Sequence, residues 1–192
     1  MSSAWSDPKR IAPTAVAAIL AAAYVIVSPP SVDLAAHMFR AQLFRAQGFG
    51  IWDNWWYAGH HVVGYSVLYP AVSAALSPQL AAGIAAIGTA ALFEPLVRRH
   101  FGPEAWLGAL LLGAAAATNL FSGRLAFAFG ACPALGAVLA LDRGRTRLAA
   151  GLAVLSALCS PVAALFLALA AAAHALGSRA GSPAGRPGER PA

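Results

Sequence analysis

Apolar residues fill five long stretches of the chain, and most polar residues lie between them. The five runs cover residues 11–27, 79–97, 103–118, 125–141 and 148–176. A helix needs about 20 apolar residues to cross a hydrocarbon core roughly 30 Å thick. The pattern therefore predicts an all-α integral membrane protein with about five transmembrane helices, which together form one helical domain over residues 11–176.

A shorter apolar segment, residues 67–76, precedes the second run. Pro70 and Pro78 interrupt the pattern here, because proline has no N–H to donate and disfavours helix at the residue before it. The segment is compatible with a re-entrant piece, an interfacial helix or the start of a kinked span.

Composition agrees with a membrane protein. The chain is 59% hydrophobic and only 10% charged, whereas a soluble domain carries about 25% charged residues. The net charge of +6 does not indicate nucleic-acid binding, since the arginines form short clusters between apolar runs and no basic stripe. Cys132 and Cys159 lie inside apolar runs and indicate neither a metal motif nor a disulfide framework.

The positive charges predict an orientation. Lysine and arginine in short loops favour the cytoplasmic side, and an alternating path of spans puts three clusters on one side: Lys9 and Arg10; Arg98 and Arg99; Arg143, Arg145 and Arg147. We therefore expect a multi-pass plasma-membrane protein with residues 1–10 in the cytoplasm and residues 28–70 outside. With five spans, the Pro, Gly and Ser-rich tail, residues 177–192, would also lie outside, and its composition predicts disorder.

The outer segment begins with a predicted amphipathic helix of about four turns. At about 100° per residue, a polar stripe forms that an interfacial helix would turn toward water; it contains Asp33, His37, Arg40 and Gln47. Asp33 stands where an N-cap would be, so it either caps the helix or acts in catalysis, and spacing alone does not separate the two roles.

His37 lies one turn after Asp33, so the two side chains are expected to meet. They would form a surface ion pair or contribute two ligands to one metal. Zinc needs three or four ligands, and the others would have to come from Asp53, His60 or His61. A divalent metal is thus an open alternative, and we assign no metal ligand and no cofactor.

Aromatic and polar residues alternate in the second half of the outer segment. Trp52, Trp55, Trp56 and Tyr57 are interleaved with Asp53, Asn54, His60 and His61. Tryptophan and tyrosine gather at membrane interfaces, so an aromatic belt is one reading. Rings mixed with polar groups also suit a sugar or a prenyl-phosphate headgroup, and both readings remain open.

These residues carry a resemblance to a known family. The order Asp33, His37, Arg40, "GIWDNWWYAG", Tyr65 and "LYP" resembles the first outer loop of GT-C-type polytopic glycosyltransferases and of their bacterial relatives labelled as related to 6-pyruvoyl-tetrahydropterin synthase. The later "LCSPVAALFLALAAAAHAL" is similar to another span of such proteins. In that superfamily an acidic residue near the end of the first span serves in sugar transfer from a polyprenyl-phosphate donor.

The resemblance implies a glycosyltransferase, or the N-terminal half of one, because full GT-C enzymes have about twice as many spans. By position, Asp33 would be the catalytic residue, although many GT-C enzymes carry paired acids where this chain has one. We expect the substrate to contact His37, Arg40, Trp52, Asp53, Trp55, Trp56, Tyr57, His60, His61 and Tyr65.

Positive charge near the departing phosphate is expected from arginine. Arg40 or Arg45 in the outer segment, or Arg124 in the loop "NLFSGRLAF", would supply it. The alternative for each is an ordinary contact with anionic headgroups. The expected partners are membrane lipid and a polyprenyl-phosphate sugar. A non-catalytic membrane scaffold, whose aromatic loop binds a lipid or a membrane-protein partner, is the alternative function.

Overall fold

The computed structural model describes residues 7–180, and in this part of the chain the fold is all-α. Four of the helical segments are long and apolar enough to cross a membrane: α1 (Pro8–Val27), α4 (Pro78–Phe101), Pro103–Phe121, which joins the short η2 (Pro103–Ala105) to α5 (Trp106–Phe121), and α6 (Leu125–Asp142). They coincide with the first four apolar runs. The predicted all-α membrane fold is therefore confirmed.

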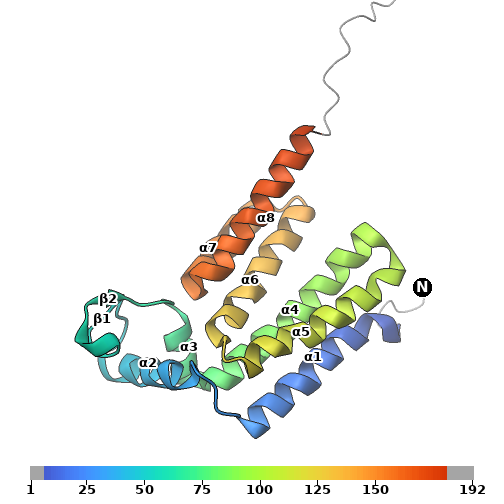
Figure 1. Ribbon diagram of the computed structural model, residues 1–192. Helices are drawn as coiled ribbons and strands as arrows, with labels where there is room; N and C mark the ends of the chain where they lie inside the picture. The colour runs from blue at the N-terminus through green and yellow to red at the C-terminus, as the bar shows by residue number, and fades with distance from the viewer. Residues whose placement is uncertain (1–6, 181–192) are drawn as a thin grey trace, which may run out of the picture.

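The fifth apolar run is not one span. It is divided into α7 (Thr146–Cys159) and α8 (Pro161–Ala180), which meet at Ser160. Ser160 has extended backbone angles, φ −157° and ψ 113°, and Pro161 cannot continue the preceding helix because it lacks an N–H. The chain reverses here, so α7 and α8 run in opposite directions (Figure 1).

Small residues form much of the interior of the helix bundle. The fully buried positions of α1, α4 and α5 are largely alanines, with Tyr24 as a large exception that packs edge-on against Phe121. Small side chains let helices approach closely in lipid, where packing holds them together. Where α5 packs against α1, a Cβ added to Gly113 would overlap the carbonyl oxygen of Pro13.

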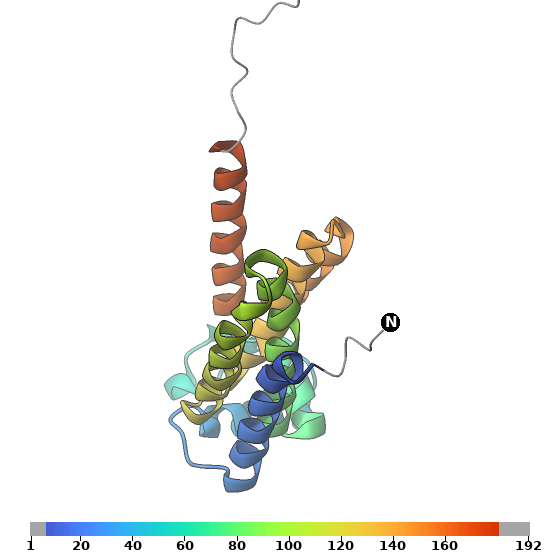
Figure 2. The same cartoon turned by 90° about the vertical axis from the view of Figure 1, so that its right-hand side faces the viewer.

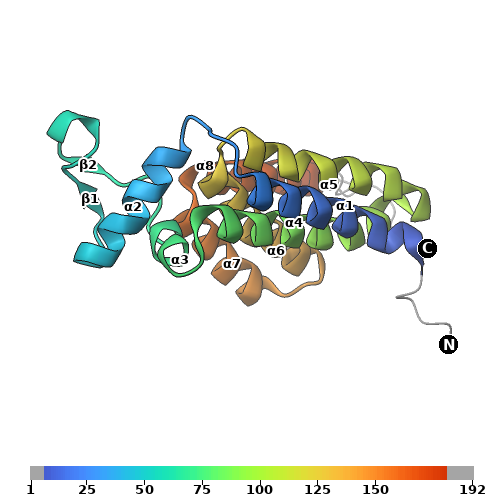
Figure 3. The same cartoon turned by 90° about the horizontal axis from the view of Figure 1, so that it is seen from below.

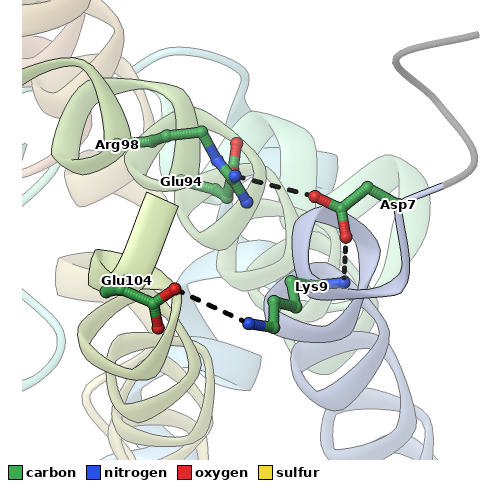
Figure 4. Close-up of polar contacts among 5 residues, drawn as sticks. All are labelled: Asp7, Lys9, Glu94, Arg98 and Glu104. Atoms are coloured by element: carbon green, nitrogen blue, oxygen red, sulfur yellow. Dashed lines mark hydrogen bonds and ion pairs between the residues drawn. The ribbon is translucent and has the colours of Figure 1, made fainter. Parts of the chain in front are cut away.

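Charged residues hold helices together where α4 ends and α1 begins. Arg98 bonds Glu94 one turn earlier at 2.5 Å and lies 3.6 Å from Asp7, the N-cap of α1. Lys9 of α1 reaches Glu104 of η2 at 3.8 Å (Figure 4). We call this end of the molecule, with residues 98–100 and 142–147, the basic end.

The opposite end carries a layer of short elements, which we call the cap end. It comprises α2 (Leu34–Gln47), β1 (Trp52–Asp53), η1 (Tyr57–Gly59), β2 (Val62–Val63) and α3 (Tyr69–Leu76). The predicted amphipathic helix is confirmed as α2, whereas the small β1–β2 hairpin was not predicted. Seen from below, the hairpin projects sideways beyond the helix bundle (Figure 3).

The short apolar segment before the second span is a helix of its own, α3. It ends at Ser77, whose φ of 97° breaks it from α4. The buried Tyr69 hydroxyl donates to the carbonyl of Pro78 at 2.7 Å, and Arg45 of α2 donates to the carbonyl of Ala74. These bonds hold α3 between α2 and the start of α4.

The course of α6, α7 and α8 places the end of α8 on the basic side. α6 ends beside Arg99 and His100 at the basic end, and α7 ends at the cap end, where the backbone N–H groups of Val67 and Leu68 donate to Leu158. From there α8 runs back toward the basic end (Figure 1). Five-span counting put the tail on the opposite side from residues 1–10, whereas the end of α8 points toward the basic end, where Lys9 of α1 also lies. Of the predicted disordered tail, residues 177–180 continue α8, and the rest lies outside the described residues, as do residues 1–6.

Candidate functional site

A cavity of about 520 Å³ opens at the cap end between α2, the segment before α3, and the first turns of α6 and α8. It collects residues that are far apart in the sequence. Its polar lining consists of Asp33, His37, Arg40, Tyr65 and Arg124, and its apolar lining of Ala36, Ala126, Phe127, Val162 and Phe166. The cavity thus has a charged side formed mainly by α2 and an apolar side formed by α6 and α8.

Asp33 occupies the N-cap position of α2, but its side chain makes no capping hydrogen bond. Its backbone lies in the right-handed helical region, φ −94° and ψ −8°, whereas a capping residue usually has extended angles so that its side chain can turn back over the first N–H groups. The exposed carboxylate lines the cavity instead. Capping therefore does not account for an aspartate here.

His37 lies one turn further along the same face of α2. Burial lowers its pKa, and a hydrogen bond with the Gly123 backbone and the nearby Asp33 carboxylate offset this only in part. The imidazole packs edge-on against Tyr69, with ring centres 5.2 Å apart. His37 is therefore mainly neutral at neutral pH, and it joins α2 to the turn between α5 and α6.

Two guanidinium groups line the cavity in different settings. Arg40 is half-buried and donates to the carbonyl of Ser66 at 2.8 Å, which ties α2 to the segment before α3. Arg124 is exposed and precedes the first residue of α6. With one carboxylate, two guanidinium groups and a neutral imidazole, the lining carries a net positive charge, which favours an anionic ligand.

Tyr65 connects the cap to the break between α7 and α8. Its hydroxyl lies 3.1 Å from the Ser160 hydroxyl, and either group can donate. The adjacent Ser66 hydroxyl donates to the carbonyl of Leu158 at 3.5 Å. The wall of the cavity therefore depends on the chain reversal at Ser160.

The apolar wall was not predicted as part of the site. Phe127 of α6 and Phe166 of α8 contact each other with ring centres 6.1 Å apart, and Val162 lies one turn before Phe166. The sequence contained one signal, Pro161, because a proline inside a long apolar run indicates a break. A break here brings the start of α8 beside α2 and not into the middle of the bundle.

The aromatic hairpin stands outside this cavity. Asp53 is buried, and its carboxylate accepts from the backbone N–H groups of Trp55 at 2.8 Å and Trp56 at 3.4 Å, so it holds a turn. Trp52 stacks on His61, whose ring also bonds the Asn54 side chain.

Of the ten residues expected to contact substrate, the cavity therefore brings together His37, Arg40 and Tyr65. The others lie in or beside the hairpin: Trp52, Asp53, Trp55, Trp56, Tyr57, His60 and His61. Trp52 and Asp53 help to line a second, smaller cavity of about 120 Å³ that also touches Arg40. Trp56 packs against Phe39 of α2 at 5.3 Å, while Trp55 is exposed.

No metal site is formed within residues 7–180. In that range no three His, Cys, Asp or Glu side chains lie close enough together to hold an ion. The Asp53 carboxylate already accepts hydrogen bonds from backbone N–H groups, and the His61 ring is hydrogen-bonded to the Asn54 side chain. The residues considered as zinc ligands are thus not gathered around Asp33 and His37.

The cavity can bind an anionic group and an apolar chain side by side. Arg124 and Arg40 suit a phosphate, Asp33 can accept a proton from a hydroxyl, and the wall formed by Phe127, Val162 and Phe166 suits a hydrocarbon. Comparisons with known protein families, curated proteins and solved structures found no match to this chain.

Proposed function

We propose that this protein is a GT-C-like membrane glycosyltransferase, or the N-terminal half of one, and that it transfers a sugar from a polyprenyl-phosphate donor. The observation that carries the proposal is the cavity at the cap end, in which Asp33 and two arginines face an apolar wall. A lipid-linked sugar phosphate combines these chemistries in one molecule, because it has a hydrocarbon chain, an anionic phosphate and a hydroxyl-rich sugar.

The proposed orientation places the cap end at the outer face of the plasma membrane. The three basic clusters of the sequence lie in loops or ends remote from the cap, and lysine and arginine favour the cytoplasmic side. The apolar wall of the cavity lies on the first turns of α6 and α8. A donor would then have its prenyl chain in the outer leaflet and its phosphate at the level of Arg124.

The proposed chemistry is a single displacement at the anomeric carbon of the donor. An acceptor hydroxyl forms the new bond to this carbon, Asp33 takes the hydroxyl proton, and the bond from carbon to phosphate oxygen breaks. Polyprenyl phosphate leaves, and Arg124 with Arg40 stabilises its added negative charge. In this scheme Asp33 acts on transfer, whereas Arg124 acts on donor binding.

The difference between these roles gives the test. The full chain is purified in detergent, and its bound lipids are identified by mass spectrometry. We expect a polyprenyl-phosphate sugar with the unchanged chain and with Asp33→Asn, and its loss with Arg124→Gln. Arg143→Gln, which removes an exposed arginine at the basic end, is the matched control and should retain the donor.

Sugar transfer is then measured in cells that depend on this gene, as the amount of glycan product that they form. Asp33→Asn should reduce this amount by roughly 100-fold or more, since general-base catalysis contributes about 10²–10⁴-fold. Unchanged products with Asp33→Asn, or no donor bound to the unchanged chain, would rule out the proposed reaction.

A non-catalytic scaffold is the second candidate, and the exposed hairpin favours it. Trp52 and Trp55 are 57% and 67% exposed, and Phe49 and Ile51 are exposed as well. Such an aromatic surface suits a membrane interface or a protein partner. A stable membrane-protein partner that is lost with Trp55→Ala, together with the absence of a donor lipid, would support this function over the first.

A further inference from the structure

Another cavity lies at the basic end, far from the proposed donor site. It is an apolar groove of about 370 Å³ between α8, the α6–α7 hairpin and the end of α4. Figure 2 shows α8 standing apart from the α6–α7 hairpin, with the distance between them widening toward this end. The groove is thus open where the helices separate.

The lining changes from apolar to polar along the groove. The deeper part is formed by Ala153 of α7 together with Leu167 and Ala170 of α8. One or two turns closer to the basic end, the lining includes Asp142, Thr146 and His174. A ligand that fits this gradient has a long apolar portion and a polar head.

The surroundings of the polar part are positively charged. Asp142 is the acidic residue of the lining, and it is paired with Arg99 at 3.2 Å and with His100 at 2.9 Å. Three exposed arginines stand next to Asp142 and Thr146 in the sequence: Arg143 and Arg145 lie in the turn between α6 and α7, and Arg147 lies in the first turn of α7. These arginines do not line the groove itself, but their charge beside its polar end complements the phosphate of an anionic lipid headgroup.

We propose that this groove is a binding site for an anionic phospholipid of the leaflet at the basic end. One acyl chain lies along the alanine-lined part between α7 and α8, and the phosphate lies by the arginines of the α6–α7 turn. The site uses none of the residues of the cap-end cavity, so it does not depend on the proposed glycosyl transfer.

The test is native mass spectrometry of the full chain in detergent, with phosphatidylglycerol or phosphatidylcholine added at equal concentrations. We expect phosphatidylglycerol to bind more tightly. Replacing Arg143, Arg145 and Arg147 together by Gln should remove this preference, at about fivefold in affinity for each arginine lost. The corresponding triple replacement by Lys preserves the charge and should retain the preference.

A second variant tests the groove itself. Ala170→Phe adds a ring on an exposed face of α8 that lines the groove, so it should weaken binding of both lipids without unfolding the bundle. Equal binding of the two lipids by the unchanged chain would overturn the proposal, as would a stoichiometric polypeptide that displaces lipid from the groove.

Discussion

His37 is a single residue that makes the stability of this protein depend on pH. Its folded-state pKa is lowered, mainly by burial, whereas in the unfolded chain it is near the usual value of about 6.5. The unfolded chain therefore takes up the proton first as pH falls, so stability decreases from about pH 6.5 down to the folded-state pKa and changes no further below it.

We predict that His37→Gln flattens this pH dependence. The variant should have a lower melting temperature at pH 7.5, because the bond with the Gly123 backbone is altered, but it should lose less on transfer to pH 5.5 than the unchanged chain. Melting in detergent at the two pH values measures this. His60→Gln, which changes an exposed histidine of the hairpin, is the control. If the melting temperature of His37→Gln changes with pH as much as that of the unchanged chain, other groups cause the pH dependence.

Gly123 is a residue whose backbone and surroundings both require glycine. Its φ is +82°, and an added Cβ would lie 2.7 Å from the Ser31 hydroxyl oxygen and 2.9 Å from its Cβ. Gly144 has a similar φ of +70°, but an added Cβ would meet nothing within 4 Å. The two positions thus share the conformational strain and differ in the steric contact.

We predict that Gly123→Ala destabilises the protein more than Gly144→Ala. Both should lose about 1–2 kcal/mol from the left-handed backbone, and Gly123→Ala should lose about 1–3 kcal/mol more from overpacking. Thermal melting of the two variants gives the comparison. Equal losses would show that the α1–α2 segment moves away from the α5–α6 turn without cost.

At the scale of elements, the contact of α5 with α1 depends on Gly113. A Cβ there would overlap the Pro13 carbonyl, whereas one at Gly108 in the same helix would meet nothing within 4 Å. Gly113→Ala should therefore lower the melting temperature, at a cost of about 1–3 kcal/mol. Gly108→Ala should leave it unchanged or raise it slightly, because alanine favours helix over glycine. A Gly113→Ala variant as stable as Gly108→Ala would exclude the close approach.

At the scale of the whole molecule, the reversal at Ser160 decides where the chain ends up. The α8 helix, with about 30 Å of length for 20 residues, returns from the cap end to the basic end. If the basic end is cytoplasmic, the end of α8 lies on the same side as Lys9 of α1.

Cysteine labelling in cells tests this arrangement. In a chain with Cys132 and Cys159 replaced by Ala, a membrane-impermeant maleimide should label His60→Cys in intact cells. It should label Arg145→Cys and Gly177→Cys only after permeabilisation. Labelling of Gly177→Cys in intact cells would favour a continuous fifth span, whereas labelling of Arg145→Cys would reverse the proposed orientation.

The sequence by itself determined the fold class, four of the spans and the helix that begins after Asp33, because each rests on local periodicity or on a run of apolar residues. It also indicated Asp33, His37 and Arg40, since they share one face of the predicted helix, and Tyr65 through the resemblance alone. Arg124 was indicated by its loop position alone, without a partner.

Only the tertiary structure decided which of these residues share a cavity. Packing brings Arg124, Phe127 and Phe166 to Asp33 across about 90–130 residues of sequence, and no local pattern encodes that distance. It also placed Asp53 and His61 outside this cavity, in the hairpin, where their side chains make hydrogen bonds. The break at Ser160 also sets the direction of α8. It separates α8 from α6 and α7 at the basic end, and the groove lies between them.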